Sequence, residues 1–359
     1  MTKQDFIPKF NNEFPKNGTV SYQSPSNIAL VKYWGKYGEQ LPENASISFT
    51  LSNCHTKTTL EFEEKVSSDF EFEVYLDGNR EVGFEPKIHS FFERVETYLP
   101  FLRKYCFTIK TTNSFPHSSG IASSASGMSA LALCLLEMER MMAKGNMTDE
   151  FFTQKASFLA RLGSGSAARS VEGPLVVWGQ HPEIGRATNL YGVKFNGPVH
   201  DTFVNYQDAI LLVDKGEKQV SSTVGHNLMH GHPYAQQRFA TANSNLSKLI
   251  AILESGDLES FIDVVESEAL QLHAMMMSSM PYFILMKPNT LEIINRIWAY
   301  RKETNSKLCF TLDAGANVHV LYPYSEKETV SAFIQKDLAP FCKNGEYILD
   351  EAGLGAVKL

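Results

Sequence analysis

The feature that most constrains the fold is a serine- and glycine-rich segment, residues 113–127, that runs directly into the apolar stretch 128–138. A Gly/Ser turn that opens into a helix presents free backbone N–H groups, and the helix macrodipole adds partial positive charge there. An anion is the natural ligand of such a turn, although a serine-rich connection with a good helix cap would have the same composition. Four hydroxyls could donate to phosphate oxygens or bind a metal ion: those of Ser118, Ser119, Ser123 and Ser124.

Two common nucleotide-binding fingerprints do not account for this segment. It lacks the lysine of the Walker pattern GxxxxGK[ST], and its glycines do not have the GxGxxG spacing. The sequence therefore predicts an anion site of another kind at the start of a long helix.

The composition argues against some partners and leaves small ligands open. With 359 residues the chain is long enough for two domains, and 43% hydrophobic with 20% charged residues is ordinary for a globular protein. A net charge of −7 without a lysine- or arginine-rich stripe argues against a nucleic-acid partner. Five widely spaced cysteines without a CxxC pair indicate reduced thiols, and we see no apolar signal region or membrane-length run. We expect a cytoplasmic protein without a membrane partner.

Hydrophobic periodicity predicts a strand-rich first half and a helix-rich second half, which is an α+β fold with a boundary near residue 200. Strands are expected at residues 19–23, 43–52, 58–64, 70–76, 80–84, 105–111, 174–178 and 208–213 and on both sides of residue 313. Helices are expected at residues 88–99, 125–144, 148–162, 234–254, 258–277, 290–303 and 326–339. The Asp77-Gly78 pair predicts a hairpin turn between two of the strands.

Residues 27–36 have the sequence NIALVKYWGK, which places Lys32 and Lys36 around a Tyr-Trp-Gly turn. Lysines at this spacing could lie on an exposed helical face, where water solvates their charge. Trp34 beside Gly35 instead indicates a packed loop, and lysine is a compact cation that suits phosphate or carboxylate oxygens. The pattern alone leaves both interpretations open.

Two charged residues lie in otherwise small or apolar surroundings. Arg169 belongs to a second Gly/Ser turn, residues 163–170, and its planar fork could bind a carboxylate or phosphate or form a loop salt bridge. Asp313 follows an apolar strand and precedes a glycine turn. An aspartate is costly to bury there unless it is paired or used in chemistry, although it could also cap the turn.

Three histidines, His226, His230 and His232, suggest a zinc site at first sight. The segment has no HExxH pattern, and Gly and Pro interrupt any single helical face, so we do not predict a zinc site. The methionines at residues 275–277 and Met280 are expected to fill a core or groove.

Taken together, four stretches resemble the diphosphomevalonate decarboxylase family of the GHMP kinase superfamily. The family patterns are NIAxxKYWGK, a proline-led loop ending in GLASSA, GSGSACRS and FDAGPN. The chain carries their counterparts at residues 27–36, 116–125, 163–170 and 312–317. The first and third patterns are specific to the decarboxylase branch, and the resemblance spans nearly the whole chain.

Six residues depart from the family patterns. Ile121 and Ala316 keep the bulk of the usual leucine and proline, and Ala168 replaces a cysteine whose thiol the chemistry does not require. Three further departures could alter substrate preference or loop packing: His117, Glu172 and His226, the last where methionine is usual.

The resemblance implies a GHMP-type two-domain fold with the active site in the cleft between the halves. Residues 1–200 would form a nucleotide-binding domain like domain 2 of ribosomal protein S5, and residues 201–359 a helix-rich α/β domain. The implied reaction converts ATP and (R)-5-diphosphomevalonate to isopentenyl diphosphate, ADP, phosphate and CO₂, with Mg²⁺ as cofactor. A homodimer is typical of the family.

The resemblance also implies a role for individual residues. Asp313 would act on the C3 hydroxyl as general base or orienting acceptor, Lys32 would lie near that oxygen, and Arg169 would bind the substrate carboxylate. The implied substrate-binding residues are Asn27, Tyr33, Lys36, Ser164, Ser166 and Arg169. The implied ATP-binding residues are Pro116, Ser118, Ser119, Gly120, Ile121, Ala122, Ser123 and Ser124, with Ser124 also a candidate Mg²⁺ ligand.

Other functions share the same scaffold. A 5-phosphomevalonate decarboxylase or a mevalonate 3-kinase would carry most of these motifs, and a non-catalytic nucleotide-binding GHMP module would carry the loops. The presence of Lys32, Arg169 and Asp313 together favours decarboxylation over a kinase that stops at phosphorylation. The sequence does not distinguish a monophosphate tail from a diphosphate tail.

Overall fold

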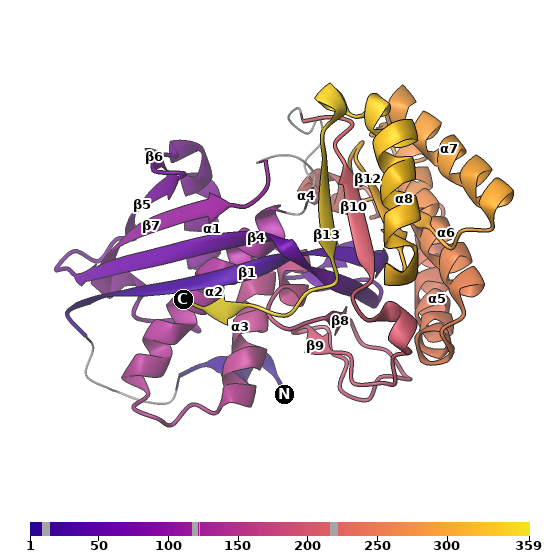
Figure 1. The fold of residues 1–359 in the computed structure, drawn as a ribbon. Helices are drawn as coiled ribbons and strands as arrows, with labels where there is room; N and C mark the ends of the chain where they lie inside the picture. Colours follow the sequence, from indigo (N-terminus) through magenta and orange to yellow (C-terminus); the bar gives the residue numbers. More distant parts are fainter. Residues whose placement is uncertain (9–14, 117–120, 122, 216–221) are drawn as a thin grey trace.

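The computed structural model describes residues 1–8, 15–116, 121, 123–215 and 222–359. It has one large sheet, built mainly from the first half of the chain, and a smaller sheet from the second half, each covered by helices (Figure 1). The expected α+β class is therefore confirmed. None of the helices in these described ranges is long and apolar enough to cross a bilayer.

The large sheet follows the order β14-β1-β4-β7-β5-β6, with β8 pairing to β4 and β9 to β8. Its β5 and β7 run parallel, and the other described pairs are antiparallel. The strand bounds are β1 (Asn17–Val31), β4 (Ser46–Glu64), β5 (Glu71–Leu76), β6 (Asn79–Arg80), β7 (Tyr105–Asn113), β8 (Leu175–Trp178), β9 (Val193–Lys194) and β14 (Val357–Lys358). A separate ladder joins β2 (Lys36–Tyr37) and β3 (Leu41–Pro42).

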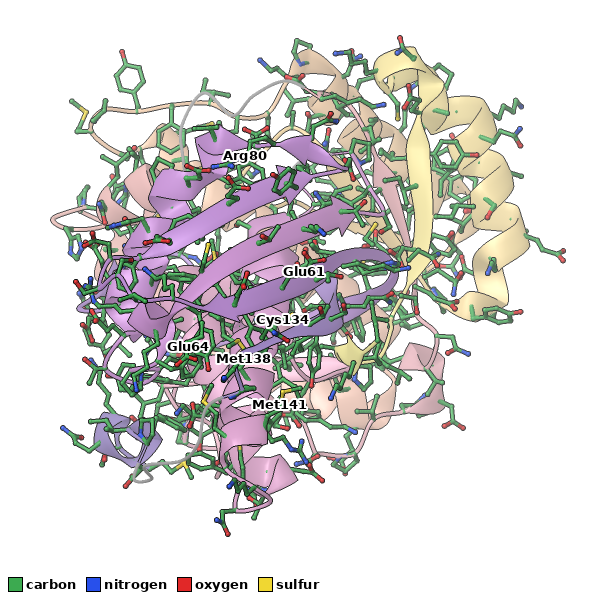
Figure 2. The ribbon with its side chains drawn as sticks, turned by 90° about the vertical axis from the view of Figure 1, so that its left-hand side faces the viewer. Glu61, Glu64, Arg80, Cys134, Met138 and Met141 are labelled. Atoms are coloured by element: carbon green, nitrogen blue, oxygen red, sulfur yellow. The ribbon has the colours of Figure 1, made fainter. Side chains whose placement is uncertain are left out.

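Three helices pack on one face of the large sheet: α1 (Glu85–Val95), α2 (Ser123–Met142) and α3 (Asp149–Gly163). Alternation along β4 explains this packing, because Leu60 and Phe62 are buried in the core shared with these helices. Glu61 lies between them on the open face, and Figure 2 shows it on the sheet with Cys134 labelled on α2. As predicted, Thr148 caps α3, accepting a hydrogen bond from a backbone N–H in its first turn.

The smaller sheet has the order β11-β12-β10-β13. Its strands are β10 (Gln207–Leu211), β11 (Cys309–Thr311), β12 (Val318–Tyr322) and β13 (Tyr347–Glu351). The helices of this half are α4 (Ser222–Asn227), α5 (Ala235–Ser255), α6 (Leu258–Met277), α7 (Pro288–Thr304) and α8 (Lys327–Phe333). Short helical turns are η1 (Lys3–Phe6), η2 (Val82–Phe84), η3 (Leu102–Lys104), η4 (Gly165–Arg169), η5 (Asp201–Phe203), η6 (Tyr324–Glu326), η7 (Ile334–Leu338), η8 (Ala339–Phe341) and η9 (Lys343–Gly345).

The two halves share a core. One cluster of buried apolar residues includes Ile28 and Phe49 from the large sheet together with Leu246 of α5 and Val265 of α6. The chain also returns at its end, where β14 pairs with β1 (Figure 1). The division at residue 200 stays a prediction, and the shared core is what holds the two halves against each other.

The observed strands differ from the predicted ones where both faces are covered. Strand β1 continues to Val31, whereas the sequence predicted only residues 19–23, because every residue from Ser24 onward is buried and the polar/apolar alternation is lost. Strand β4 joins two segments that were predicted separately. The hairpin turn at Asp77-Gly78 is confirmed, but the strand after it is only two residues long before η2 begins. Strand β13 was not predicted.

Candidate active site

A cavity of about 450 Å³ opens where the end of β1, η4, the N-terminus of α2 and the turn after β11 meet. Eight residues predicted for the site line it: Lys32, Tyr33, Lys36, Ser124, Ser164, Ser166, Arg169 and Asp313. The rest of the lining comes from Ala29, Trp34, Gln40, Lys87, Ser90, Arg94, Gly163, Gly165, His226, Leu272 and Ala314. The structure thus brings together side chains that are 281 residues apart in sequence.

Lys32 lies immediately after β1 and forms an ion pair with Asp313, with 3.1 Å between Nζ and Oδ1. Lys32 is 2% exposed, whereas the Asp313 side chain is 29% exposed toward the cavity. Burial lowers the pKa of Lys32, and the Asp313 carboxylate opposes that shift. The two lysines of residues 27–36 are therefore not an exposed helical face; β1 bulges between Ala29 and Val31 and directs the next residue inward.

A buried network fixes the backbone of Lys32. Its N–H donates to the Glu268 carboxylate at 2.8 Å, and its carbonyl accepts from the amide of Asn44 at 2.9 Å. Glu268 itself accepts two hydrogen bonds from Arg238, at 2.9 and 2.5 Å, and one from Asn245 at 2.7 Å. Helices α5 and α6 therefore hold the backbone of Lys32 in place.

Asp313 follows β11 and is held by its backbone. The Nε2–H of His273 donates to the Asp313 carbonyl at 3.1 Å, and the Gly315 N–H donates to the same oxygen at 2.7 Å. Burial lowers the pKa of His273 to about 4, so this ring is neutral at physiological pH. The turn presents the Asp313 carboxylate to Lys32 and to the cavity.

Arg169, in η4, is a buried cation on the same cavity. It is 3% exposed, its Nη1 donates to the Ser46 hydroxyl at 2.6 Å, and its Nε donates to the Asn27 side-chain carbonyl at 3.4 Å. Burial lowers its pKa to about 10, with Asp313 opposing the shift, so the guanidinium stays charged. Asn27 does not line the cavity: its amide donates to the Ser166 carbonyl and the Ser170 hydroxyl.

The two Gly/Ser turns meet at the cavity wall. The hydroxyl oxygens of Ser124 and Ser164 lie 3.5 Å apart, and α2 begins one residue before Ser124. Pro116 and Ile121 do not line the cavity, and Ile121 is buried in the core shared by both halves. The remaining loop predictions, for His117, Ser118, Ser119, Gly120 and Ala122, lie outside the described residues.

Lys36 and Tyr33 also line the cavity. Lys36 donates to the Gln40 side-chain oxygen at 2.8 Å, and its pKa is lowered by burial and by nearby Arg94. The Tyr33 ring packs at 4.7 Å from Trp178 and at 4.3 Å from His226, centroid to centroid. Burial raises the pKa of Tyr33, so its hydroxyl is neutral and can act as a donor.

Comparison with known proteins identifies the family of this chain. Residues 24–188 match the family model "Diphosphomevalonate decarboxylase-like N-terminal domain", and residues 209–354 match "Mevalonate 5-diphosphate decarboxylase C-terminal domain". The chain belongs to the diphosphomevalonate decarboxylase family of the GHMP superfamily.

Individual relatives agree with this assignment. The Rattus norvegicus diphosphomevalonate decarboxylase is 26% identical over 369 residues, covering 94% of this chain and 84% of the relative. A solved structure described as MDDEF in complex with MVAPP, AMPPCP and magnesium is 26% identical with a TM-score of 0.81, covering 96% of this chain and 99% of that chain. The mevalonate diphosphate decarboxylase from Legionella pneumophila is 28% identical with a TM-score of 0.77, covering 92% of this chain and 100% of that one.

This family member also carries cavity residues that sequence reasoning missed. Lys87, Ser90 and Arg94 of α1 line the cavity at a spacing of one helical face. Ser90 and Arg94 fall within the predicted helix 88–99 and Lys87 lies just before it, but nothing local indicated that the helix faces a cavity. Lys87 and Arg94 thus add two cations to the cavity that Lys36 also lines.

A second cavity, of about 270 Å³, adjoins the first along α2. Lys87 and Ser124 line both cavities. Most of its walls are apolar or small side chains from α1, α2 and the large sheet, among them Ile88, Ile109 and Met128. It is therefore a less charged extension of the first cavity, past the N-terminus of α2.

The departures from the family patterns occupy different places. Ala168 is buried against Tyr33 and Trp178, and the Glu172 carboxylate accepts the Lys194 N–H away from the cavity. Ala316 is nearly buried, and its carbonyl accepts from Thr290. Of the departures that the structure describes, His226 is the one that lines the cavity, and His117 lies outside the described residues.

Proposed function

We propose that this chain catalyses the ATP-dependent decarboxylation of (R)-5-diphosphomevalonate to isopentenyl diphosphate, ADP, phosphate and CO₂, a step of isoprenoid biosynthesis by the mevalonate pathway. The relatives named above are diphosphomevalonate decarboxylases, and one solved relative holds MVAPP, AMPPCP and magnesium. The observation that carries the proposal is the Lys32–Asp313 ion pair, which lies in a cavity that Arg169 also lines.

The first chemical step needs an activated tertiary alcohol. Asp313 accepts the proton of the C3 hydroxyl or orients that hydroxyl. The C3 hydroxyl oxygen attacks the γ-phosphorus of ATP, and the bond between the γ-phosphorus and the oxygen that leaves with ADP breaks. Lys32, 3.1 Å from the carboxylate, favours the ionised form of Asp313 and stabilises negative charge on the attacking oxygen. Phosphate then becomes the leaving group in place of hydroxide.

The second step breaks two bonds. The C3–O bond to phosphate and the C1–C2 bond to the carboxylate break, and the electron pair of the latter forms the new C2–C3 double bond. Arg169 binds the carboxylate through a planar guanidinium and fixes its orientation for this loss. Its two hydrogen bonds to Asn27 and Ser46 hold the guanidinium in place.

The nucleotide phosphates are assigned to the N-terminus of α2, between the two cavities. Backbone N–H groups and the helix dipole there favour anions, and the smaller, mostly apolar cavity next to them suits a planar base. Mg²⁺ prefers oxygen ligands and usually takes phosphate oxygens, which fits the Ser124 hydroxyl as a ligand. No set of three His, Cys, Asp or Glu side chains within the described ranges could hold a metal ion without such phosphate ligands. When bound, Mg²⁺ neutralises charge on the transferring phosphoryl group.

The test is a parallel assay of CO₂ and ADP from purified protein with ATP and Mg²⁺. Three substrates are compared: mevalonate, 5-phosphomevalonate and 5-diphosphomevalonate. We expect equimolar CO₂ and ADP with the diphosphate. Preference for the monophosphate would assign the alternative decarboxylase activity, and ADP without CO₂ would assign a 3-kinase. Nucleotide binding without turnover of any substrate would contradict the proposal.

Cellular location and assembly are also proposals. All five cysteines are free thiols, which suits the reducing cytoplasm. We expect a homodimer by analogy with the family, and light scattering of the purified protein would determine the mass.

A further inference from the structure

His226, in α4, lies at the wall of the larger cavity and packs against two aromatic rings. Its ring centroid is 4.3 Å from that of Tyr33 and 4.5 Å from that of Trp34. It is 8% exposed and lines the cavity. The preceding glycine makes this close packing possible, because a Cβ at Gly225 would approach Trp34 to 2.6 Å.

One hydrogen bond determines the tautomer of this ring. The backbone N–H of Gly35 donates to Nδ1 at 3.0 Å, so Nδ1 carries no proton. Burial, Lys36 and Arg169 lower the pKa of His226 to about 3, so the ring is neutral near pH 7. A neutral ring with a bare Nδ1 carries its proton on Nε2, which is therefore a hydrogen-bond donor.

Two other buried histidines use both ring nitrogens in hydrogen bonds within the protein. His232 accepts the Tyr234 N–H at Nδ1 and donates from Nε2 to the Met275 carbonyl at 3.1 Å. His181 accepts the Glu183 N–H at Nδ1 and donates from Nε2 to the Asn243 carbonyl at 3.1 Å. Both nitrogens of each ring are thus used to hold backbone segments.

His226 follows this pattern at Nδ1 and departs from it at Nε2. No described residue accepts a hydrogen bond from its Nε2–H. Because the ring lines the cavity, this N–H is available to an acceptor that a ligand brings there. The charged groups that act on the ring, Lys36 first and Arg169 second, are both cations, so the expected ligand is an anion.

We propose that His226 is a specificity residue for the substrate: its Nε2–H donates to an anionic oxygen of the phosphoryl tail. The inference rests on the proposed function, which supplies a substrate with a carboxylate at one end and phosphates at the other. Arg169 is assigned to the carboxylate, which leaves the other cations of the cavity, Lys36, Lys87 and Arg94, for the phosphoryl tail. The residue before Lys36, Gly35, donates its N–H to the His226 ring, so the contact is assigned to the tail and not to the carboxylate.

The test separates the two nitrogens by substitution. His226→Asn keeps an acceptor near the position of Nδ1 and removes the Nε2–H donor, whereas His226→Gln places an N–H donor near the position of Nε2. His232→Asn is the matched control, a buried histidine whose ring does not line the cavity. Calorimetric titration gives the Kd of each protein for 5-diphosphomevalonate and for mevalonate, and steady-state assays give KM and kcat.

A hydrogen bond to a charged group predicts that His226→Asn weakens diphosphomevalonate binding roughly 10-fold or more, with kcat reduced much less than affinity. We expect His226→Gln to restore most of the affinity, and His232→Asn to bind as the wild type does. The loss should disappear with mevalonate, which has no phosphoryl tail. In wild-type protein labelled with ¹⁵N-histidine, the Nε2 signal of His226 should shift when diphosphomevalonate is added.

Several results would overturn the proposal. Wild-type affinity in His226→Asn, an equal loss in His226→Gln, or an equal loss with mevalonate would each remove the tail contact. If a variant does not fold, an unchanged Nε2 signal in the saturated wild-type complex would do the same. Failure of the proposed function is recognised separately, because wild-type protein would then neither bind nor turn over the diphosphate.

Discussion

Two buried lysine–carboxylate pairs in this protein have the same chemistry and different surroundings. Between α2 and α3, the Lys155 ammonium donates to both Glu139 oxygens, at 2.7 and 2.6 Å, and to the Tyr98 carbonyl at 3.0 Å. The two side chains are 0% and 2% exposed. At the cavity, Lys32 donates once, to Asp313 at 3.1 Å, and the aspartate is 29% exposed.

The difference lies in how many donors are satisfied. An ammonium has three N–H donors, and Lys155 uses all of them inside the protein. Among the residues that the structure describes, Asp313 is the one acceptor recorded for the Lys32 ammonium. Lys32 lines the cavity, so its remaining donors can bind a ligand there. The two histidines differ in the same way: His232 uses both ring nitrogens inside the protein, whereas His226 uses Nδ1 alone among the described residues.

Exchanging lysine for methionine at position 32 gives the largest expected effect on activity. Lys32→Met removes the charge beside Asp313, and we expect kcat to fall roughly 1,000-fold, within the range for loss of acid–base and electrostatic catalysis. The unfolding free energy should change by less than about 1 kcal/mol, because Asp313 is partly solvated. Steady-state kinetics and urea unfolding measure the two. A near-normal kcat in Lys32→Met would show that the Lys32–Asp313 pair is not catalytic and does not differ in function from the Lys155–Glu139 pair.

The same exchange at position 155 should lower the unfolding free energy and leave kcat nearly unchanged. Lys155→Met leaves Glu139 buried without a partner, which costs about 3–5 kcal/mol of unfolding free energy. Burial already raises the pKa of Glu139 and lowers that of Lys155, so neither charge is well tolerated alone. Urea unfolding measures the loss, and kcat per folded molecule should stay within about two-fold of wild type. A specific loss of kcat without loss of stability would contradict the comparison.

Two buried arginines sharpen the comparison further. Arg161 donates to the backbone carbonyls of Glu39 and Leu190, whereas Arg169 lines the cavity. We expect Arg169→Lys to lower kcat/KM roughly 100-fold, because an ammonium cannot reproduce bidentate carboxylate binding. Arg161→Lys should reduce stability and leave kcat/KM unchanged. Parallel CO₂ and ADP assays measure kcat/KM for both variants. Equal losses in Arg169→Lys and Arg161→Lys would be evidence against a carboxylate site at Arg169.

The smallest expected effect concerns pH. The folded-state pKa of His226 is about 3, below its ordinary value of 6.5, so the unfolded chain binds the proton first as the pH falls. Its contribution to stability is complete above pH 6.5 and is lost progressively toward pH 3, by roughly 2 kcal/mol at pH 5. His226→Asn should therefore lose less stability than wild type between pH 7 and pH 5. Urea unfolding at both pH values tests this, and equal losses would show that the ring is already able to charge in the folded protein.

Local patterns predicted much of this molecule. The amphipathic periods of α3 and α6, the hairpin at Asp77-Gly78 and the motif residues Lys32, Arg169 and Asp313 all depend on neighbours in sequence or on a resemblance. The strand containing Asn27 was not predicted to its full length, because burial on both faces removes the alternation by which a strand is recognised.

The remaining site residues could not be assigned because they are defined by tertiary contacts. Lys87 and Arg94 look like the polar face of an ordinary helix until α1 is placed against the cavity. Glu268 supports Lys32 from 236 residues away, and no local signal links the two. The open Nε2 of His226 likewise becomes visible only when the Gly35 N–H is seen at Nδ1.

The most direct measurement is a single-turnover experiment on wild type and Asp313→Asn, with enzyme in excess over radiolabelled 5-diphosphomevalonate and saturating ATP and Mg²⁺. The account predicts one ADP and one CO₂ per substrate in wild type. In the variant both rates should fall together by about three orders of magnitude, while the substrate Kd stays within a few-fold. ADP formation by Asp313→Asn at the wild-type rate would contradict the role given to the Lys32–Asp313 pair.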